Sequence, residues 1–246
     1  MTWPEDAESA VEPVVEPVVG VPAGGGADLA EAVAPDGSPV AVYLVAPGRD
    51  DAALIDAEIP FSASVLDLGC GAGRIAHQLA DLGHDVVGVD ESEAMIAQLR
   101  DDVEGVVTRI EDLDLPRRFD VVLLMSHLIN VIGRKRRHAL LAACARHVAA
   151  GGVVLVQRYP VGWLRNLDVQ AGRIGDVEIT MSVAGWQADT FSGEVVYRLG
   201  DRTWTQHFEG EAVDDEALDE ALTQAGLHRD AQLDAAGSWV RARPLR

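Results

Sequence analysis

One short stretch decides the fold of this chain, Val65-Leu66-Asp67-Leu68-Gly69-Cys70-Gly71-Ala72-Gly73. Its first four residues form an apolar run of the length of a buried strand, and the glycines that follow end that strand. Ile75, Leu79 and Leu82 then recur at helical spacing before Gly83 ends the helix. A glycine-rich turn lets the backbone approach a ligand closely, and the start of the next helix presents unpaired N–H groups. The stretch therefore predicts a strand–loop–helix unit that binds a small molecule.

Strands and helices continue to alternate after this unit. Further strands are predicted at 85–89, 105–108, 119–125 and 153–156. The first helix between them begins at Ser92, an N-cap residue, and carries Met95, Ile96 and Leu99 on one face. A later helix has an apolar face and ends at Gly151-Gly152; that face contains Leu140, Leu141, Cys144 and Val148. Apolar strands that alternate with amphipathic helices predict an α/β fold, a mainly parallel sheet with helices on both faces.

The pattern changes after Pro160. Segments 177–184, 194–199 and 203–208 alternate as antiparallel strands separated by glycine-containing turns. A helix over 215–225 and two strands, at 231–233 and 239–241, follow. We expect the last two strands to close the main sheet, which then has seven strands. Residues 37–246 are therefore predicted to form one domain, with a ligand-binding core at 61–160, a small antiparallel insertion at 161–210, and a terminal helix and strands at 211–246.

The first 36 residues differ from the rest. They carry acids but no Lys or Arg, and they contain the repeat Val11-Glu12-Pro13-Val14-Val15-Glu16-Pro17 and the run Gly24-Gly25-Gly26. Acidic, Pro-rich and Gly-rich composition of this kind is typical of disordered chain. We expect residues 1–36 to be a disordered acidic tail.

Composition excludes several classes of partner. The 246 residues include 40 acids and 20 bases, a net charge of −20 that disfavours nucleic acid as a substrate. No run approaches the roughly 18 apolar residues that span a bilayer, so no membrane segment is expected. The N-terminus lacks the pattern of a signal peptide, and two cysteines suit a reducing compartment, which together favour a cytoplasmic protein. Near-exclusive use of Arg over Lys, with much Ala and Gly, suggests a bacterial source.

An acid spaced from the glycine loop points to the ligand. Asp90 ends the second strand about 20 residues after the loop, where a carboxylate accepts the hydroxyls of a ribose. A dinucleotide fingerprint would place glycine at position 74, where Arg74 stands, which argues against a nicotinamide-dependent oxidoreductase. No Cys, His and carboxylate grouping has the spacing of metal ligands, and we expect no metal.

The pattern of an acid followed by GxGxG resembles motif I of the class I S-adenosylmethionine-dependent methyltransferases, which have a Rossmann-like sheet. The resemblance covers roughly residues 43–159 and implies S-adenosyl-L-methionine as the cofactor. It implies that Asp67 faces the methionine ammonium, with Gly69 and Gly71 lining that end, and that Asp90 holds the ribose. The remaining residues expected around the cofactor are Cys70, Glu91, Met95, Glu111 and Met125. Arg109 stands where many members carry an Asp near the adenine, and Glu111 or Asp112 is expected in its place.

In that family the segment after the fourth strand faces the reacting methyl, and here it spans 125–130. His127 is the candidate general base, because its usual pKa of about 6.5 suits proton transfer; packing at a strand end is its alternative role. Tyr159, Arg158 and His207 are further candidates. Aromatic residues gather after Arg158, either as core or as a wall around an apolar or aromatic acceptor.

The predicted function is methyl transfer to an oxygen or nitrogen of a small molecule. The alternative is a protein that binds the cofactor without transferring its methyl group, as a sensor or partner subunit, because binding and chemistry are separable. Tyr43 is placed to close over the cofactor. The basic cluster at 134–138 forms either a solvated face or a contact with an acidic substrate or the tail. The oligomeric state is left open.

Overall fold

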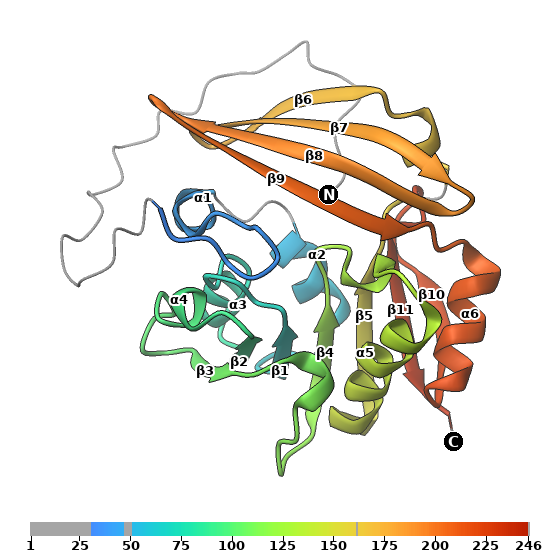
Figure 1. The fold of residues 1–246 in the computed structure, drawn as a ribbon. Coiled ribbons are helices and arrows are strands. Elements are labelled where there is room, and N and C mark those ends of the chain that lie inside the picture. The colour runs from blue at the N-terminus through green and yellow to red at the C-terminus, as the bar shows by residue number, and fades with distance from the viewer. Residues whose placement is uncertain (1–30, 47–50, 161, 246) are drawn as a thin grey trace.

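The computed structural model describes residues 31–46, 51–160 and 162–245, which contain two β-sheets (Figure 1). The larger sheet has seven strands in the order β10-β11-β5-β4-β1-β2-β3. Its parallel part consists of β1 (Ser64–Leu68), β2 (Asp85–Asp90), β3 (Glu104–Val107), β4 (Phe119–Leu124) and β5 (Val148–Gln157). The antiparallel hairpin β10 (Leu227–Gln232) and β11 (Trp239–Pro244) adds to β5. The predicted mainly parallel, seven-stranded sheet is confirmed.

Helices cover both faces of this sheet. On one face α5 (Arg134–His147) and α6 (Asp215–Gln224) pack on a core that includes Leu66 and Leu68. On the other, α2 (Asp51–Glu58) and α3 (Ala76–Asp81) pack on a core that includes Val65. Because neighbouring residues of β1 point to opposite faces and both faces are covered, the strand is a continuous apolar run.

The helix α4 (Glu93–Ile96) is shorter than predicted. Ser92 is its N-cap, as expected, and the Ser92 hydroxyl accepts a hydrogen bond from the Met95 N–H at 3.3 Å. The helix ends at Ile96, and Leu99 follows in a turn and packs beside Gly88 and Gly105 instead of extending the helical face.

The boundary between α5 and β5 corrects the sequence-based prediction. The helix ends at His147, and Val148 already belongs to the strand, so Gly151 and Gly152 lie inside β5 and do not end the helix. Gly152 is required by a close approach of the neighbouring strand: a Cβ there would lie 2.6 Å from the Asp120 carbonyl oxygen. A glycine inside a strand often has this meaning, which the sequence pattern alone does not separate from a helix stop.

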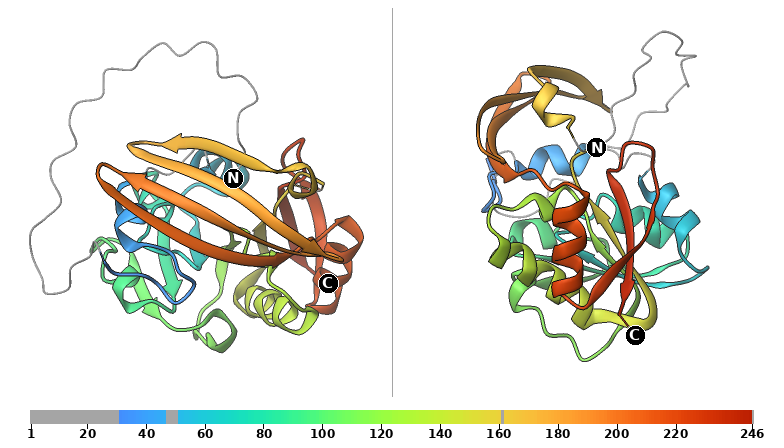
Figure 2. Two further views of the ribbon diagram at one scale, coloured as in Figure 1. Left: turned by 45° about the horizontal axis from the view of Figure 1, so that its top comes forward. Right: turned by 90° about the vertical axis from the view of Figure 1, so that its right-hand side faces the viewer.

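The second sheet is antiparallel and lies over the first (Figures 1 and 2). Its strands are β6 (Val169–Ile174), β7 (Val177–Gln187), β8 (Thr190–Leu199) and β9 (Arg202–Glu211), in that order. The sequence predicted β7, β8 and β9 but not β6, in which only Ile174 is buried. The short helix α1 (Val40–Val45) lies between the two sheets: Val42 packs under the antiparallel sheet, and Val40 packs against Ala72 of the glycine loop.

The N-terminal prediction falls mostly outside the described residues, because residues 1–30 are not among them. Residues 31–36 pack on the domain: Ala34 is buried, and the Gln206 side-chain amide donates to the Asp36 carbonyl at 3.2 Å. Among the described residues, no helix has the length and apolar character needed to cross a bilayer.

Candidate active site

The glycine loop between β1 and α3 has a backbone that other residues rarely adopt. Gly69, Gly71 and Gly73 have φ values of +75°, +55° and +83°, in the region that glycine enters without steric penalty. A Cβ on Gly69 would lie 2.6 Å from Cδ1 of Leu128, which follows β4. The glycine loop is therefore in contact with the loop after β4, so that the predicted cofactor segment and the predicted acceptor segment meet.

Asp67 is a buried carboxylate beside this loop. Its side chain is 1% exposed, and neither of its oxygens has a hydrogen-bond partner among the described residues. Burial raises its pKa from 3.8 to about 7, the nearby Arg74 opposes that rise, and Asp90 adds to it. A buried, unpartnered carboxylate is unfavourable in isolation and is stabilised by a cation that donates hydrogen bonds. The site therefore fits the ammonium group of S-adenosylmethionine.

Asp90 at the end of β2 is held by the backbone on both sides. One oxygen accepts from the Gly71 N–H at 3.0 Å and the other from the Ser92 N–H at 2.9 Å. Burial raises the pKa of Asp90, and these two hydrogen bonds oppose the rise. A carboxylate has about four acceptor positions, so these backbone hydrogen bonds do not exhaust its capacity to bind a hydroxyl such as that of a ribose.

The other predicted cofactor residues occupy different positions. Met95 is buried with Ala72 beneath α1, next to the glycine loop. Cys70 lies in the loop with its thiol against Gly88, and burial raises the pKa of that thiol well above its usual value. Glu91 is exposed directly after Asp90, and Met125 is buried in the core that contains Val65.

Glu111 forms ion pairs with two arginines. It lies in the short 3₁₀ helix η1 (Ile110–Asp112), and its Oε1 is 3.3 Å from Nη2 of Arg109 and 3.6 Å from Nε of Arg136. Its contact with an adenine stays a prediction.

His127 lies in an unusual turn after β4. Ser126 and His127 have φ values of +52° and +62°, and the Leu128 N–H donates to the Met125 carbonyl at 3.1 Å. The His127 ring stacks on Tyr159 with centroids 3.9 Å apart and planes 16° apart. Burial lowers the pKa of His127 well below 6.5, so its imidazole is neutral at physiological pH.

A cavity of about 360 Å³ lies beside this pair, between the ends of β5 and β9, the first turn of α5 and one face of α6 along its length. Tyr159, Asn130, Pro160 and Trp186 line it. Its charged lining residues are Arg134, Arg137, Arg165, Asp189, Glu211, Asp214 and Glu220. Because Tyr159 both lines the cavity and stacks on His127, the cavity adjoins the loop that contacts the cofactor segment.

The basic cluster at the start of α5 pairs with the chain's own acids. Arg134 lies 2.9 Å from Glu220, and Arg137, which is buried, lies 3.3 Å from Glu211. These pairs join α5 to α6 and to the end of β9. They show why cations are placed at a helix start, where the helix dipole disfavours them.

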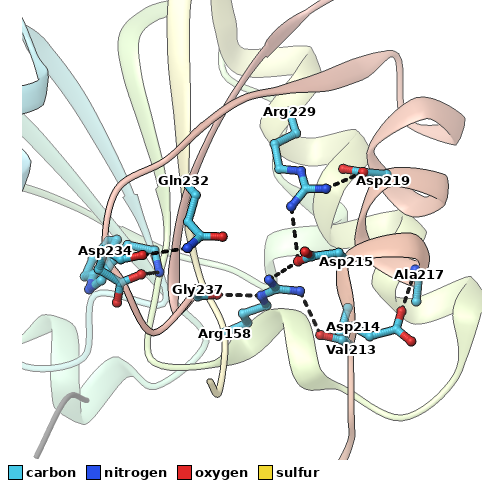
Figure 3. Close-up of polar contacts among 11 residues, drawn as sticks. Arg158, Val213, Asp214, Asp215, Ala217, Asp219, Arg229, Gln232, Asp234 and Gly237 are labelled. Carbon is cyan, nitrogen blue, oxygen red and sulfur yellow. Dashed lines mark hydrogen bonds and ion pairs between the residues drawn. The ribbon is translucent and has the colours of Figure 1, made fainter. Parts of the chain in front are cut away.

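Arg158, a weaker catalytic candidate, has a structural role (Figure 3). The side chain is 1% exposed; Nε donates to the Gly237 carbonyl at 2.8 Å, Nη1 donates to the Val213 carbonyl at 3.0 Å, and Nη2 pairs with Asp215. These contacts join β5 to the terminal hairpin and to α6. His207, the other weaker candidate, is exposed on β9, 4.0 Å from Glu194.

Two buried amides that hold the site were missed by sequence reasoning. Asn130 donates to the Glu211 carbonyl at 2.9 Å and accepts from the Tyr159 N–H at 3.0 Å, so it connects the ends of three chain segments. Gln157 accepts from the Ser126 N–H at 2.9 Å. These partners lie 29 to 81 positions apart, and no local pattern connects them; polar residues at the ends of parallel strands are the one available signal.

Comparison with known proteins gives consistent results. Residues 65–152 match a family model described as a methyltransferase domain. The chain is 31% identical, over 72% of its length and 75% of the relative's, to the dTDP-3-amino-3,6-dideoxy-alpha-D-glucopyranose N,N-dimethyltransferase of Streptomyces fradiae. It is 34% identical to the ubiquinone biosynthesis O-methyltransferase of Bradyrhizobium diazoefficiens over 40% of this chain and 41% of that protein.

Among solved structures, the CcbJ methyltransferase from Streptomyces caelestis superimposes with a TM-score of 0.68 at 23% identity, over 84% of this chain and 96% of that one. This likeness shows the shared fold. The extent of the Streptomyces fradiae match, together with the glycine loop and the two acids that accompany it, shows the family. The chain belongs to the class I S-adenosylmethionine-dependent methyltransferases.

Proposed function

We propose that this methyltransferase transfers the methyl group of S-adenosylmethionine to the amino nitrogen of a small polar molecule of the amino-sugar class. The observation that carries the proposal is the polar cavity that shares Tyr159 with the loop after β4. In open α/β sheets, ligands bind at the carboxyl ends of the strands, which is where this cavity lies.

The polarity of the cavity favours a sugar over an apolar ring. Seven charged side chains line it, and six of them form ion pairs with one another. Their remaining donor and acceptor positions suit hydroxyl groups better than an apolar ring. Aromatic contact is limited to Tyr159 and Trp186, an arrangement that suits a molecule with one apolar face and several hydroxyls. The cavity therefore supports a polar acceptor in place of the apolar or aromatic one that the aromatic-rich sequence suggested.

The amino nitrogen is proposed on two grounds. The Streptomyces fradiae relative, by its name, methylates the amino group of a 3-amino sugar, and it matches most of this chain. The net charge of −20 also attracts a cationic amine more than a neutral alcohol. The Bradyrhizobium diazoefficiens relative, an O-methyltransferase, matches a smaller part of the chain.

The chain's own residues supply binding and alignment. S-adenosylmethionine supplies an electrophilic methyl group on a sulfonium centre. Asp67 pairs with the cofactor ammonium, and Asp90 binds the ribose hydroxyls. Tyr159, whose pKa is raised by burial, stays protonated and lines the cavity proposed for the acceptor. Alignment of nucleophile, carbon and sulfur in a closed site provides most of the acceleration that a displacement needs.

His127 as a general base stays a prediction. Its ring lies behind Tyr159 and does not line the cavity. Its low pKa keeps it neutral, so it is able to accept a proton, although it holds that proton weakly. A His127→Gln variant tests the role: loss of a general base lowers kcat about 10²–10⁴-fold and removes the acidic limb of the pH profile.

The experiment that tests the function offers two matched acceptors. Purified protein and S-adenosylmethionine are incubated with a nucleotide-linked amino sugar and with its hydroxyl analogue, and methylated product is detected by mass spectrometry. We expect methylation of the amine alone. Methylation of the hydroxyl analogue alone would favour the O-methyltransferase function. Tight cofactor binding without methylation of either compound would refute this acceptor class. It would favour the alternative function, a protein that binds the cofactor without transferring its methyl group.

We also propose that the protein works in the cytoplasm of a bacterium. Cys70 and Cys144 are buried free thiols, which supports a reducing compartment. The net charge supports an acceptor other than nucleic acid.

A further inference from the structure

The turn after β4 has a conformation that its sequence does not favour. Two successive residues, Ser126 and His127, have positive φ, and the Leu128 N–H closes the turn on the Met125 carbonyl. Positive φ at both central positions is the pattern of a type I′ turn, which normally takes Gly, Asn or Asp there. Positive φ at two successive residues other than glycine is uncommon and costs strain, although His adopts it more often than most residues, so contacts from outside the turn help to hold it.

One side chain is placed to do so. Gln157 is the last residue of β5 and is buried, and its Oε1 accepts a hydrogen bond from the Ser126 N–H at 2.9 Å. This bond fixes the orientation of the peptide group that precedes Ser126. It therefore fixes the entry into the turn, and with it the direction in which His127 leaves the backbone.

The turn is also where the two halves of the site meet. Leu128 occupies the space beside Gly69 of the glycine loop, and His127 stacks on Tyr159, which lines the cavity. A displacement of the turn would alter both contacts. The conformation of this turn therefore determines how the glycine loop and the proposed acceptor cavity lie relative to each other.

We propose that Gln157 is a positioning residue of this methyltransferase, which holds the Ser126–His127 turn in its left-handed conformation and thereby orients His127 against Tyr159. This role follows from the geometry of the turn. Its consequence for methyl transfer rests on the function proposed above. Gln157 does not line the cavity; it acts through the backbone of Ser126.

The test is a double-variant rescue. Gln157→Met removes the acceptor oxygen and keeps the length of the side chain. Ser126→Gly supplies a residue that adopts positive φ without support. If Gln157 acts by holding the turn, Ser126→Gly restores in the Gln157→Met protein what the single substitution loses. If Gln157 acts only by filling space, glycine at position 126 restores nothing.

The readout is the proton NMR spectrum of the histidine rings, which requires neither cofactor nor acceptor. The stack on Tyr159 places the His127 ring protons upfield of the other histidine signals, and a His127→Gln variant assigns them. We expect Gln157→Met to lose this upfield position and the double variant to regain it. Gln78→Met is the matched control: the Gln78 amide donates to the Arg74 carbonyl inside its own helical segment, and we expect no change in the His127 signal.

Two results would overturn the proposal. One is an unchanged His127 signal in Gln157→Met; the other is a lost signal that Ser126→Gly does not restore. Circular dichroism checks that each variant is folded. If Gln157→Met does not fold, Gln157→Glu carries the test, because it keeps an acceptor oxygen in place; the signal should persist, and its loss in a folded protein overturns the proposal.

The same variants separate this proposal from the proposed function. Where an acceptor is methylated, Gln157→Met should lower kcat/KM by about tenfold or more, since a misplacement of about 1 Å costs up to 10²-fold, and Ser126→Gly should recover most of it. The NMR result stands even if no amino sugar is methylated, so a wrong acceptor class leaves the positioning role intact.

Discussion

Replacing Asp67 with Asn should stabilise the protein without cofactor and weaken its binding of the cofactor. The reason is that Asp67 is buried and has no hydrogen-bond partner among the described residues, so its ionised form is unfavourable until a cation is bound. Burial raises its pKa from 3.8 to about 7. One pKa unit corresponds to about 1.4 kcal/mol, so at alkaline pH the ionised carboxylate costs on the order of 4 kcal/mol.

The pH dependence gives the sign of this effect. Between pH 3.8 and about 7 the folded protein keeps a proton on Asp67 that the unfolded chain has lost, so the free energy of unfolding falls as pH rises through this window. The Asn variant does not ionise at this position, so it lacks this pH-dependent loss of stability. The stability advantage of Asp67→Asn should therefore grow by about 2.5 kcal/mol between pH 5 and pH 8.

Cofactor binding should change in the opposite direction. The ammonium of S-adenosylmethionine pairs with the ionised carboxylate, and a hydrogen bond to a charged group contributes about 1.5–3 kcal/mol, so Asp67→Asn should weaken binding roughly 10- to 100-fold. In the unsubstituted protein, affinity should fall as pH drops below about 7, because binding then releases a proton.

Denaturant unfolding of the protein without cofactor, and calorimetric titration with S-adenosylmethionine, measure the two effects at pH 5 and pH 8. Asp85→Asn is the control, because Asp85 is an exposed acid at the opposite end of β2, and it should change neither quantity. The reasoning is refuted if Asp67→Asn lowers stability at pH 8, or if it leaves cofactor affinity unchanged.

Three further substitutions test the site and its supports. Arg158→Met should lower the free energy of unfolding, measured with denaturant, by about 1–3 kcal/mol for each backbone carbonyl left without a donor. Unchanged stability would contradict the structural role of Arg158. Gly69→Ala should lower the free energy of unfolding by about 1–3 kcal/mol and weaken cofactor binding, measured by calorimetry. The reason is that the new Cβ would lie 2.6 Å from Leu128 on a residue with a φ of +75°. Unchanged cofactor affinity would argue against this close contact. Burial lowers the pKa of His147, and its Nε2 accepts from the Leu115 N–H at 3.0 Å, so the ring stays neutral in the folded protein. The free energy of unfolding should therefore fall as pH drops below about 6.5, where the unfolded chain takes up a proton. Thermal melts of His147→Gln should show a weaker loss of stability at low pH, and an equal loss would contradict this prediction.

The sequence alone predicted the class of fold, which the structure confirms, and it named the residues that we propose for cofactor binding. Asp67, the glycine loop and Asp90 belong to consecutive elements of one β–α–β unit, and the chemistry of their roles depends on local spacing. The main sheet followed for the same reason, since apolar strands alternating with helices have few other ways to bury both faces. The sequence prediction was wrong where one local signal has two meanings, as with Gly152 inside β5, and it missed β6, a strand with a single buried residue.

Only the tertiary structure shows the cavity that we propose for the acceptor. The cavity is formed by the ends of β5 and β9, the first turn of α5 and one face of α6, and contacts such as Asn130 with Glu211 join residues 81 positions apart. The left-handed turn at Ser126–His127 likewise has a hydrogen bond to a distant residue, Gln157, to which we assign its conformation. The physical reason is the range of the interactions: spacing along the chain records contacts within one supersecondary unit, whereas a cavity between units depends on how those units pack.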